Sequence, residues 1–220
     1  MTITVAAFTK SYAGRRVLDM PAFQLEPGTI TAIIGANGSG KSTCAKVLGG
    51  VEPADDRNWR PPQVRVGHMP QKSFAFRMSV AKNIGLLADD PERAARLAEA
   101  LGLDGLMEAR AKRLSGGETA KMALARLLMG SFDLLILDEP TASMDMEGTL
   151  AAEGLVREYV NETGCAVLMV THSLQQARRL ADRVFFLAKG KLVEQGSAEE
   201  VLESPREEET RRFLEFYGLG

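Results

Sequence analysis

Short apolar runs alternate with helical patterns along the whole chain. Strand-like runs occur at residues 2–8, 16–18, 23–25, 29–34, 64–69, 134–137, 166–170, 184–187 and 191–194. The runs at 134–137 and 166–170 are almost purely apolar, which is typical of parallel strands buried on both faces. Because helical patterns separate many of these runs, the order of elements predicts an α/β fold.

One long segment contains helical patterns only. The strands stop between about Ser79 and Arg113, where two helices are predicted. A helical segment inside an α/β frame indicates an inserted subdomain, which we place at about residues 73–130. The tail, residues 197–217, is again helical and heavily charged. No repeat or linker divides the sequence, so we expect one domain over residues 1–220.

Composition limits the classes of function. The chain has 220 residues, of which 45% are hydrophobic and 25% charged, a globular composition with a net charge of −2. This balance gives no sign of the broad basic surface of a nucleic-acid binder, so we expect no nucleic-acid partner. No apolar run is long enough to span a bilayer, and no secretion signal precedes the first strand. Two cysteines in apolar elements suit a reduced, cytoplasmic protein, so any work at a membrane must pass through another chain.

A glycine-rich segment follows the apolar run 29–34 and precedes a helical pattern. Its sequence, Gly-Ala-Asn-Gly-Ser-Gly-Lys-Ser-Thr over residues 35–43, matches the spacing of a P-loop. Glycines let successive backbone N–H groups point at one phosphate, and the helix that follows adds the positive end of its dipole. The residues expected to bind nucleotide here are Gly35, Asn37, Gly38, Ser39, Gly40, Lys41, Ser42 and Thr43.

Two of these residues carry specific roles. Lys41 is placed to contact the β- and γ-phosphates, and the Ser42 hydroxyl to bind Mg²⁺. The alternative is a chance glycine-rich turn, which the strand before it and the helix after it disfavour. The motif predicts a nucleoside triphosphate and says nothing further about function.

Two acidic residues end the apolar run 134–137. Asp138 would lie at the carboxyl edge of the sheet, where it can hold Mg²⁺ and its water shell. Glu139 follows directly and is positioned to orient or deprotonate an attacking water. Taken alone, the pair could instead be acidic residues at a helix N-terminus. The P-loop upstream favours a role in metal binding and base catalysis.

A third segment, Leu-Ser-Gly-Gly-Glu at residues 114–118, lies between these two motifs. Ser115 can cap the helix that follows, while Gly116 and Gly117 expose N–H groups at its positive end. It is either a helix cap without a ligand or a second phosphate-binding surface. Because it stands between a P-loop and an Asp-Glu strand end, the segment resembles the signature of the ATP-binding cassette (ABC) ATPases. This resemblance implies that Ser115, Gly116, Gly117 and Glu118 bind nucleotide.

Further segments match the family pattern in order along essentially the whole chain. Gln71 resembles the Q-loop glutamine, which touches Mg²⁺ and the attacking water. Asp145, in Ser-Met-Asp, resembles the D-loop aspartate, although the family more often has Ala-Leu-Asp. His172 resembles the switch histidine that bonds the γ-phosphate. Tyr12 resembles the aromatic residue that stacks on adenine.

The resemblance implies an ABC ATPase fold. In that fold a P-loop core with a mainly parallel sheet carries an antiparallel β subdomain and an inserted α-helical subdomain. The family pattern implies ATP and Mg²⁺ as cofactors and a second cassette of the same chain, so that ATP lies between the two copies. Glu139, His172 and Gln71 would be catalytic, and Ser42, Gln71 and Asp138 would hold the metal.

The resemblance also implies a function. We expect an ATP-hydrolysing subunit that powers a membrane transporter, docked to an integral membrane permease through residues 73–78. Residues 170–183 and 208–214 are similar to importer ATPases for oxyanions such as phosphate and tungstate, which suggests import of a small anion with an extracytoplasmic binding protein. The chain would then lie on the cytoplasmic, inner face of the membrane. The alternatives are an exporter ATPase subunit and a soluble ABC ATPase acting on nucleic acid or ribosomes.

Overall fold

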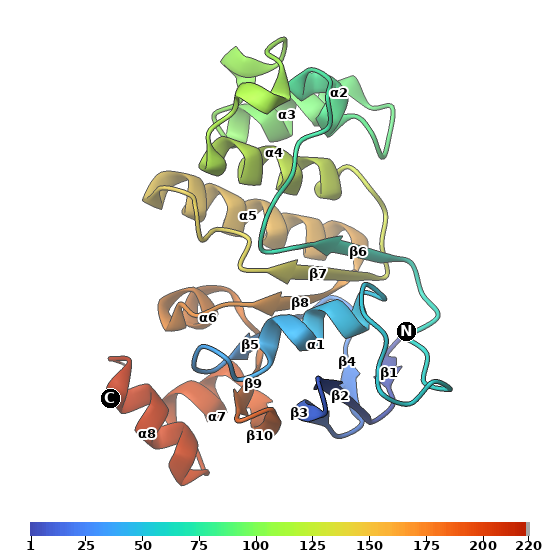
Figure 1. Ribbon diagram of the computed structural model, residues 1–220. Coiled ribbons are helices and arrows are strands. Elements are labelled where there is room, and N and C mark those ends of the chain that lie inside the picture. Colours follow the sequence, from blue (N-terminus) through green and yellow to red (C-terminus); the bar gives the residue numbers. More distant parts are fainter. Residues whose placement is uncertain (219–220) are drawn as a thin grey trace.

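A mixed eight-stranded sheet forms the centre of the computed structural model, which describes residues 1–218 (Figure 1). Its strands are β2 (Phe8–Tyr12), β3 (Arg15–Met20), β5 (Ile30–Ile34), β6 (Val66–Met69), β7 (Leu134–Asp138), β8 (Ala166–Val170), β9 (Arg183–Ala188) and β10 (Lys191–Ser197). Their order is β2-β3-β10-β9-β5-β8-β7-β6. A separate two-stranded antiparallel sheet pairs β1 (Ile3–Val5) with β4 (Phe23–Leu25).

Five neighbouring strands of the large sheet run parallel. These strands are, in spatial order, β9, β5, β8, β7 and β6. Val170 of β8 lies between Ile33 of β5 on one side and Asp138 of β7 on the other. The carboxyl ends of β5, β7 and β8 therefore meet at one edge, where ligands bind in open α/β sheets. The antiparallel pairs β2–β3 and β9–β10 extend the sheet on the other side.

The helices connect and cover these strands. They are α1 (Lys41–Leu48), α2 (Val80–Ile84), α3 (Pro91–Ala100), α4 (Gly116–Leu128), α5 (Met146–Thr163), α6 (Leu174–Leu180), α7 (Ala198–Glu203) and α8 (Glu208–Phe216). Between β6 and β7 the chain forms α2, α3, two short 3-10 turns and α4, with no strand among these described residues. Ser79, Asp90 and Ser115 cap these three helices, because each side chain accepts a hydrogen bond from a backbone N–H of the first turn.

Two apolar cores lie on opposite faces of the sheet. One contains α4, α5 and α6 and alternate residues of the central strands, such as Leu135 and Leu137 of β7. The other contains α1, the small β1–β4 sheet and the intervening residues, such as Leu134 and Ile136. Successive side chains of a strand point to opposite faces, so a strand between two cores must be apolar throughout. The purely apolar runs of the sequence predicted this arrangement.

The structure confirms the expected fold class and changes the course of two segments. The apolar run at residues 2–8 is not one strand, because β1 pairs with β4 while Phe8 begins β2 and pairs with Met20 in the large sheet. The helical tail is divided into α7 and α8 at Ser204. Pro205 explains this break, since a residue before proline is disfavoured in the helical conformation.

Candidate functional site

Four of the segments singled out in the sequence come together at the carboxyl edge of the parallel strands. The P-loop follows β5, Gln71 follows β6, Asp138 ends β7 with Glu139 after it, and His172 follows β8. Neighbouring strands thus deliver one segment each to the same edge. The convergence is a consequence of the parallel strand order.

The P-loop bends where no side chain would fit. Gly35 has φ 146° and Gly40 has φ 104°, both in the region that favours glycine. A Cβ at Gly35 would lie 2.1 Å from the carbonyl oxygen of Leu187, and one at Gly40 would lie 2.8 Å from Leu18. The loop is therefore packed directly against β9 and β3, which fixes its path into α1.

Lys41 is almost completely buried, with 6% of its surface exposed. Its Nζ donates hydrogen bonds to the carbonyl oxygens of Gly35 at 2.7 Å and Ala36 at 3.0 Å. Burial lowers the pKa of this ammonium, while the nearby carboxylates Asp138 and Glu139 oppose the shift. The loop thus holds a buried cation among its own carbonyl oxygens.

Ser42 and Asp138 form a set of oxygen atoms suited to a magnesium ion. The Ser42 hydroxyl donates to Asp138 Oδ1 at 3.0 Å. Asp138 is 1% exposed, and burial raises the pKa of its carboxyl although the bond from Ser42 opposes that shift. Over residues 1–218 no group of three or more His, Cys, Asp or Glu could hold a metal by itself. The Ser42 and Asp138 oxygens fit Mg²⁺, which commonly takes one or two protein ligands and completes its shell with phosphates and water.

Glu139 is the point where three predicted catalytic residues meet. Its Oε2 accepts a hydrogen bond from Gln71 Nε2 at 3.0 Å and lies 3.5 Å from His172 Nδ1. Its backbone has φ 50°, a left-handed conformation that is uncommon outside glycine, and its N–H donates to Val170 O at 2.9 Å. This backbone directs a carboxylate to the same edge as the P-loop, next to Asp138.

The signature segment caps α4. Ser115 Oγ accepts from the Glu118 N–H at 3.3 Å, and the Glu118 carboxylate accepts from the Ser115 N–H at 2.7 Å, which is a capping box. The bonds from Ser115 lower the pKa of Glu118. The helices α2, α3 and α4 form what we call the helical part of the molecule. Figure 1 shows α4 at the edge of this part, with α5 between α4 and β8. The N–H groups of Gly116 and Gly117 lie at the start of α4. Among the described residues, no hydrogen bond joins this helix start to the P-loop.

Asp145 joins the segment after Glu139 to α4. It caps α5 by accepting from the Gly148 N–H at 2.9 Å and lies 3.3 Å from Lys121 Nζ of α4. The bond from Gly148 is the main reason why the pKa of Asp145 is lowered. A Cβ at Gly117 would lie 2.7 Å from the Ser143 carbonyl oxygen, so glycine permits this close approach. The sequence did not single out Lys121, since it lies outside the signature and 24 residues before its partner.

Tyr12 ends β2, just before a two-residue turn at Ala13 and Gly14. Tyr12 is 42% exposed. Its hydroxyl donates to the carboxylate of Glu52, in the segment that follows α1, and burial is the main cause of its raised pKa. Thr43 at the P-loop has the opposite effect and lowers the pKa of this hydroxyl. Tyr12 therefore lies next to α1. Its hydrogen-bond partner Glu52 belongs to no motif of the sequence.

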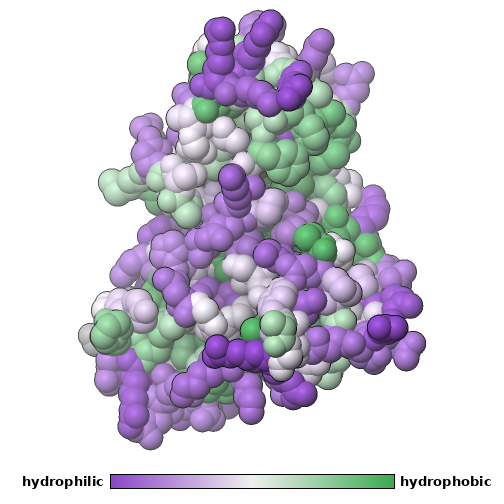
Figure 2. Space-filling model, viewed as in Figure 1, coloured by the Kyte–Doolittle hydropathy of each residue, from purple (hydrophilic) through white to green (hydrophobic). Residues whose placement is uncertain are grey.

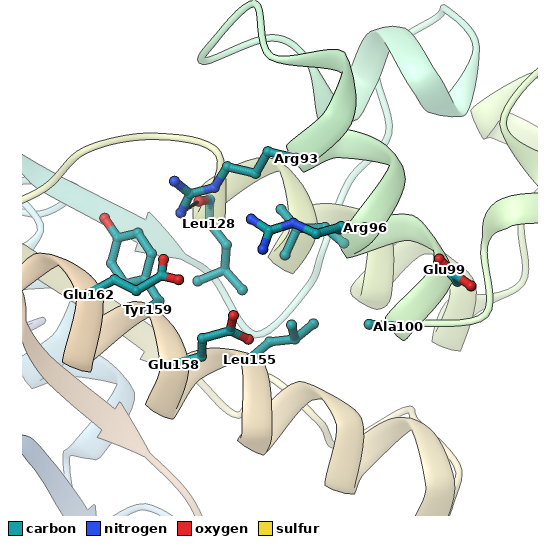
Figure 3. Close-up of a pocket in the computed structure, with 10 residues that line it drawn as sticks. Arg93, Arg96, Glu99, Ala100, Leu128, Leu155, Glu158, Tyr159 and Glu162 are labelled. Carbon is teal, nitrogen blue, oxygen red and sulfur yellow. Dashed lines mark hydrogen bonds between the residues drawn. The ribbon is translucent and has the colours of Figure 1, made fainter.

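A separate pocket of about 280 Å³ lies between α3 and α5 (Figure 3). Arg93 and Arg96 extend from α3 toward Glu158 and Tyr159 of α5. Arg93 also donates to the Leu128 carbonyl oxygen at 2.8 Å, at the end of α4. None of the predicted nucleotide-binding residues lines this pocket, so it is distinct from the candidate site.

No helix within residues 1–218 combines the length and the apolar character needed to cross a membrane.

Known proteins share both the sequence and the fold. A family model described as ABC transporter matches residues 18–142, more than half of the chain. The tungstate uptake system ATP-binding protein TupC of Peptoclostridium acidaminophilum is 35% identical over 209 residues, covering 88% of this chain and 98% of TupC. The zinc import ATP-binding protein ZnuC of Pseudomonas fluorescens (strain Pf0-1) is 37% identical over 182 residues, covering 80% of this chain and 69% of ZnuC.

Solved structures agree on the fold. An ATP-binding subunit of an ABC transporter has a TM-score of 0.81 at 19% identity, covering 98% of this chain and 100% of that one. A bacterial Atm1-family ABC exporter with ATP bound has a TM-score of 0.84 at 22% identity, covering 99% of this chain and 42% of the exporter chain. At these identities the likeness shows the fold alone. The sequence matches carry the assignment: the chain belongs to the ABC transporter family, as one of its ATP-binding ATPase chains.

Proposed function

We propose that this chain is the ATP-hydrolysing subunit of a membrane importer for a small anion, working as a dimer with ATP between its two copies. One observation carries the enzymatic part of the proposal. Gln71 and His172 both contact the Glu139 carboxylate. Glu139 directly follows Asp138, which is hydrogen-bonded to Ser42 of the P-loop. This arrangement suits attack of water on a bound phosphate.

Nucleotide binding would use charges that the fold already holds in place. The Lys41 ammonium would turn from the Gly35 and Ala36 carbonyl oxygens to the β- and γ-phosphates. The side-chain oxygens of Ser42, Asp138 and Gln71 would hold Mg²⁺. When bound, the ion supplies positive charge that offsets the charge developing on the transferred phosphoryl group. The aromatic ring of Tyr12 would stack on adenine.

Hydrolysis would depend on positioning and on one base. The Glu139 carboxylate would accept the proton of the attacking water as the water's oxygen bonds to the γ-phosphorus and the bond to ADP breaks. His172 and Gln71 would hold the phosphate and the water in line. Because Glu139 already accepts a bond from Gln71, the same carboxylate is oriented before the substrate arrives.

A second copy would complete the site. The capped start of α4, with Ser115, Gly116 and Gly117, does not bond to its own P-loop within the described residues. In a dimer this helix end could close over the γ-phosphate bound by the other copy, which is the role of a helix N-terminus toward an anion. Glu118 would maintain that end through its cap, and Asp145 would hold the loop beside it. Loss of the γ-phosphate would remove the bridge and open the dimer.

A groove beside the Q-loop is the proposed permease-docking surface. It has a volume of about 300 Å³ and is lined by Phe74, Phe76, Leu86 and Leu87, each between 42% and 50% exposed. Figure 2 shows a hydrophobic area on the helical part, on the side where α2 lies. Exposed apolar side chains gathered at one place suit a partner surface. Docking there would hold the chain at the inner face of the membrane.

The direction and cargo of transport rest on relatives. TupC and ZnuC are named as uptake or import proteins, and the TupC match covers 88% of this chain and 98% of TupC. We extend import to this chain, and the TupC name favours an oxyanion as cargo with an extracytoplasmic binding protein that delivers it.

The test is to capture the tagged chain from gently solubilised membranes of its own host and to identify its partners by mass. We expect a multi-span permease and an extracytoplasmic binding protein, whose ligand would name the cargo. The matched control replaces Phe74 and Leu87 with serine, which should reduce permease recovery without loss of ATP hydrolysis. Recovery of ribosomes or nucleic acid without a permease would contradict the transport function while leaving the ATPase chemistry intact.

A further inference from the structure

The segment that follows α1 is hydrogen-bonded to the outer end of β2. The Asp55 N–H donates to Thr9 O at 2.9 Å. The Asp55 carboxylate accepts from the Ser11 N–H at 2.8 Å, the Ser11 hydroxyl at 2.9 Å and the Thr9 hydroxyl at 3.0 Å. Residues 52–55, which we call the 52–55 segment, thus fix the strand that ends at Tyr12.

Glu52 connects this segment to both α1 and Tyr12. Its N–H donates to Lys46 O at 3.2 Å, and its carboxylate lies 3.4 Å from Lys46 Nζ. The same carboxylate accepts the Tyr12 hydroxyl, and that bond is the main cause of the lowered pKa of Glu52. Lys46 belongs to α1, whose first residue is Lys41. Glu52 therefore joins the far end of the P-loop helix to the tyrosine.

A cation occupies a position over the Tyr12 ring. Lys10 Nζ lies 5.1 Å from the ring centroid and donates to Pro53 O at 2.7 Å. The ring is consequently held through its hydroxyl by Glu52 and flanked by Lys10. Because 42% of Tyr12 is still exposed, part of the side chain remains open to a ligand.

Such restraint has a direct effect on binding. An exposed aromatic side chain loses rotamer freedom when a base stacks on it, whereas a side chain that is already fixed loses less. Thr43, in the first turn of α1, lowers the pKa of the Tyr12 hydroxyl, whereas Glu52 is paired with Lys46 later in α1. The helix therefore fixes Tyr12 relative to the P-loop.

We propose that Glu52 is a positioning residue for nucleotide binding, which holds the Tyr12 ring in the orientation that accepts adenine. The proposal rests on the proposed function, in which Tyr12 stacks on the base of ATP. The Glu52 side chain contacts Tyr12, Lys46 and Lys10, and among the described residues none of those proposed to hold the phosphates or the water. Its effect should therefore depend on Tyr12 and on the presence of a base in the ligand.

The test compares Glu52→Ala, Tyr12→Phe and the double variant by calorimetry with ATP and with inorganic triphosphate. Each single change should raise the Kd for ATP about three- to tenfold, the range for one lost hydrogen bond. The double variant should be no weaker than the weaker single variant, because both changes remove the same bond. Affinity for inorganic triphosphate should stay within about twofold. In steady state, KM for ATP should rise while kcat stays within about twofold.

Two further variants separate positioning from folding. Glu52→Gln keeps an acceptor for the Tyr12 hydroxyl, so most of the ATP affinity should return. Glu203→Ala removes another ion-paired carboxylate, which lies beside Arg178 far along the chain, and should leave the Kd for ATP unchanged. Additive losses in the double variant, an equal loss of triphosphate affinity, or an unchanged Kd for ATP in Glu52→Ala would overturn the role of Glu52. A wild-type chain that binds triphosphate and ATP equally would instead overturn the stacking role of Tyr12 in the proposed function.

Discussion

Lys41 is a buried cation whose hydrogen bonds go to the carbonyl oxygens of its own loop. Neutral acceptors satisfy the ammonium without neutralising it, and much of its desolvation cost has already been met in folding. An incoming phosphate can then replace two carbonyl oxygens at little further cost. The geometry at this single residue explains why the P-loop can bind a highly charged ligand.

Replacement of this lysine tests the phosphate site directly. In Lys41→Ala we expect the Kd for ATP to rise about ten- to a hundredfold, since a hydrogen bond to a charged group contributes about 1.5–3 kcal/mol. Calorimetry measures this, with Lys191→Ala as the control because Lys191 is exposed on β10. Unchanged affinity in Lys41→Ala would contradict the assignment of the phosphate site.

The two cysteines give a pH-dependent prediction. Burial raises the pKa of the Cys44 and Cys165 thiols to about 12. Thiolate is the reactive form and is lost below the pKa, so at pH 8 almost none is present in the folded chain. We expect iodoacetamide to label neither cysteine at pH 8, and both after unfolding in urea. Rapid labelling of the folded chain would show that these residues are not in the core.

Residues in local motifs could be predicted from the sequence, and their partners could not. Ser42 and Lys41 belong to one nine-residue spacing, so their identity and order suffice. Glu52 lies 40 residues from Tyr12, in an irregular stretch without a motif. The contact between Glu52 and Tyr12 depends on how the segment after α1 packs against β2. The pattern of residues in a single sequence does not predict such packing.

At the level of elements, a buried arginine holds the helical part together. Arg126 of α4 donates to Asn83 Oδ1 at 3.1 Å and to Phe74 O at 3.3 Å. Its guanidinium lies 5.0 Å from the ring centroids of both Phe74 and Phe76. One side chain thus connects α4, α2 and the segment after the Q-loop, at the proposed docking groove.

Removal of this guanidinium should destabilise the fold. Arg126→Met keeps similar bulk but removes the donor to the Phe74 carbonyl oxygen and one of the two donors to Asn83 Oδ1, which keeps the Phe76 N–H. We expect the free energy of unfolding to fall by about 2–3 kcal/mol, measured by urea denaturation. Arg96→Met is the control, because Arg96 is exposed on α3 and should lie within about 0.5 kcal/mol of wild type. Equal stability of both variants would contradict a structural role for Arg126.

Elements with a clear local pattern of apolar residues could be predicted well. The helix at residues 41–48 and the strand at 166–170 have the bounds that their patterns indicate. The run at 2–8 was misjudged because apolar residues in two different sheets look continuous along the chain. Pairing partners, which decide where β1 ends and β2 begins, are tertiary contacts that override local propensity.

For the whole molecule, the division into parts remains a prediction. One domain over residues 1–220, with a helical subdomain at about 73–130, agrees with the placement of α2, α3 and α4 between β6 and β7. The pair formed by Asp145 and Lys121 links that helical part to the loop after Glu139. We expect this link to transmit the state of the phosphate site to α4 and so to the start of the signature segment.

Dimer formation driven by ATP is the most direct test of this mechanism, and sedimentation velocity of Glu139→Gln measures it. We expect hydrolysis to fall by at least about a hundredfold, the usual contribution of a general base. ATP with Mg²⁺ should then convert the monomer into a stable dimer, whereas Lys41→Ala in the same background should stay monomeric. A Glu139→Gln chain that binds ATP yet stays monomeric would contradict the shared site, and full turnover would contradict Glu139 as the base.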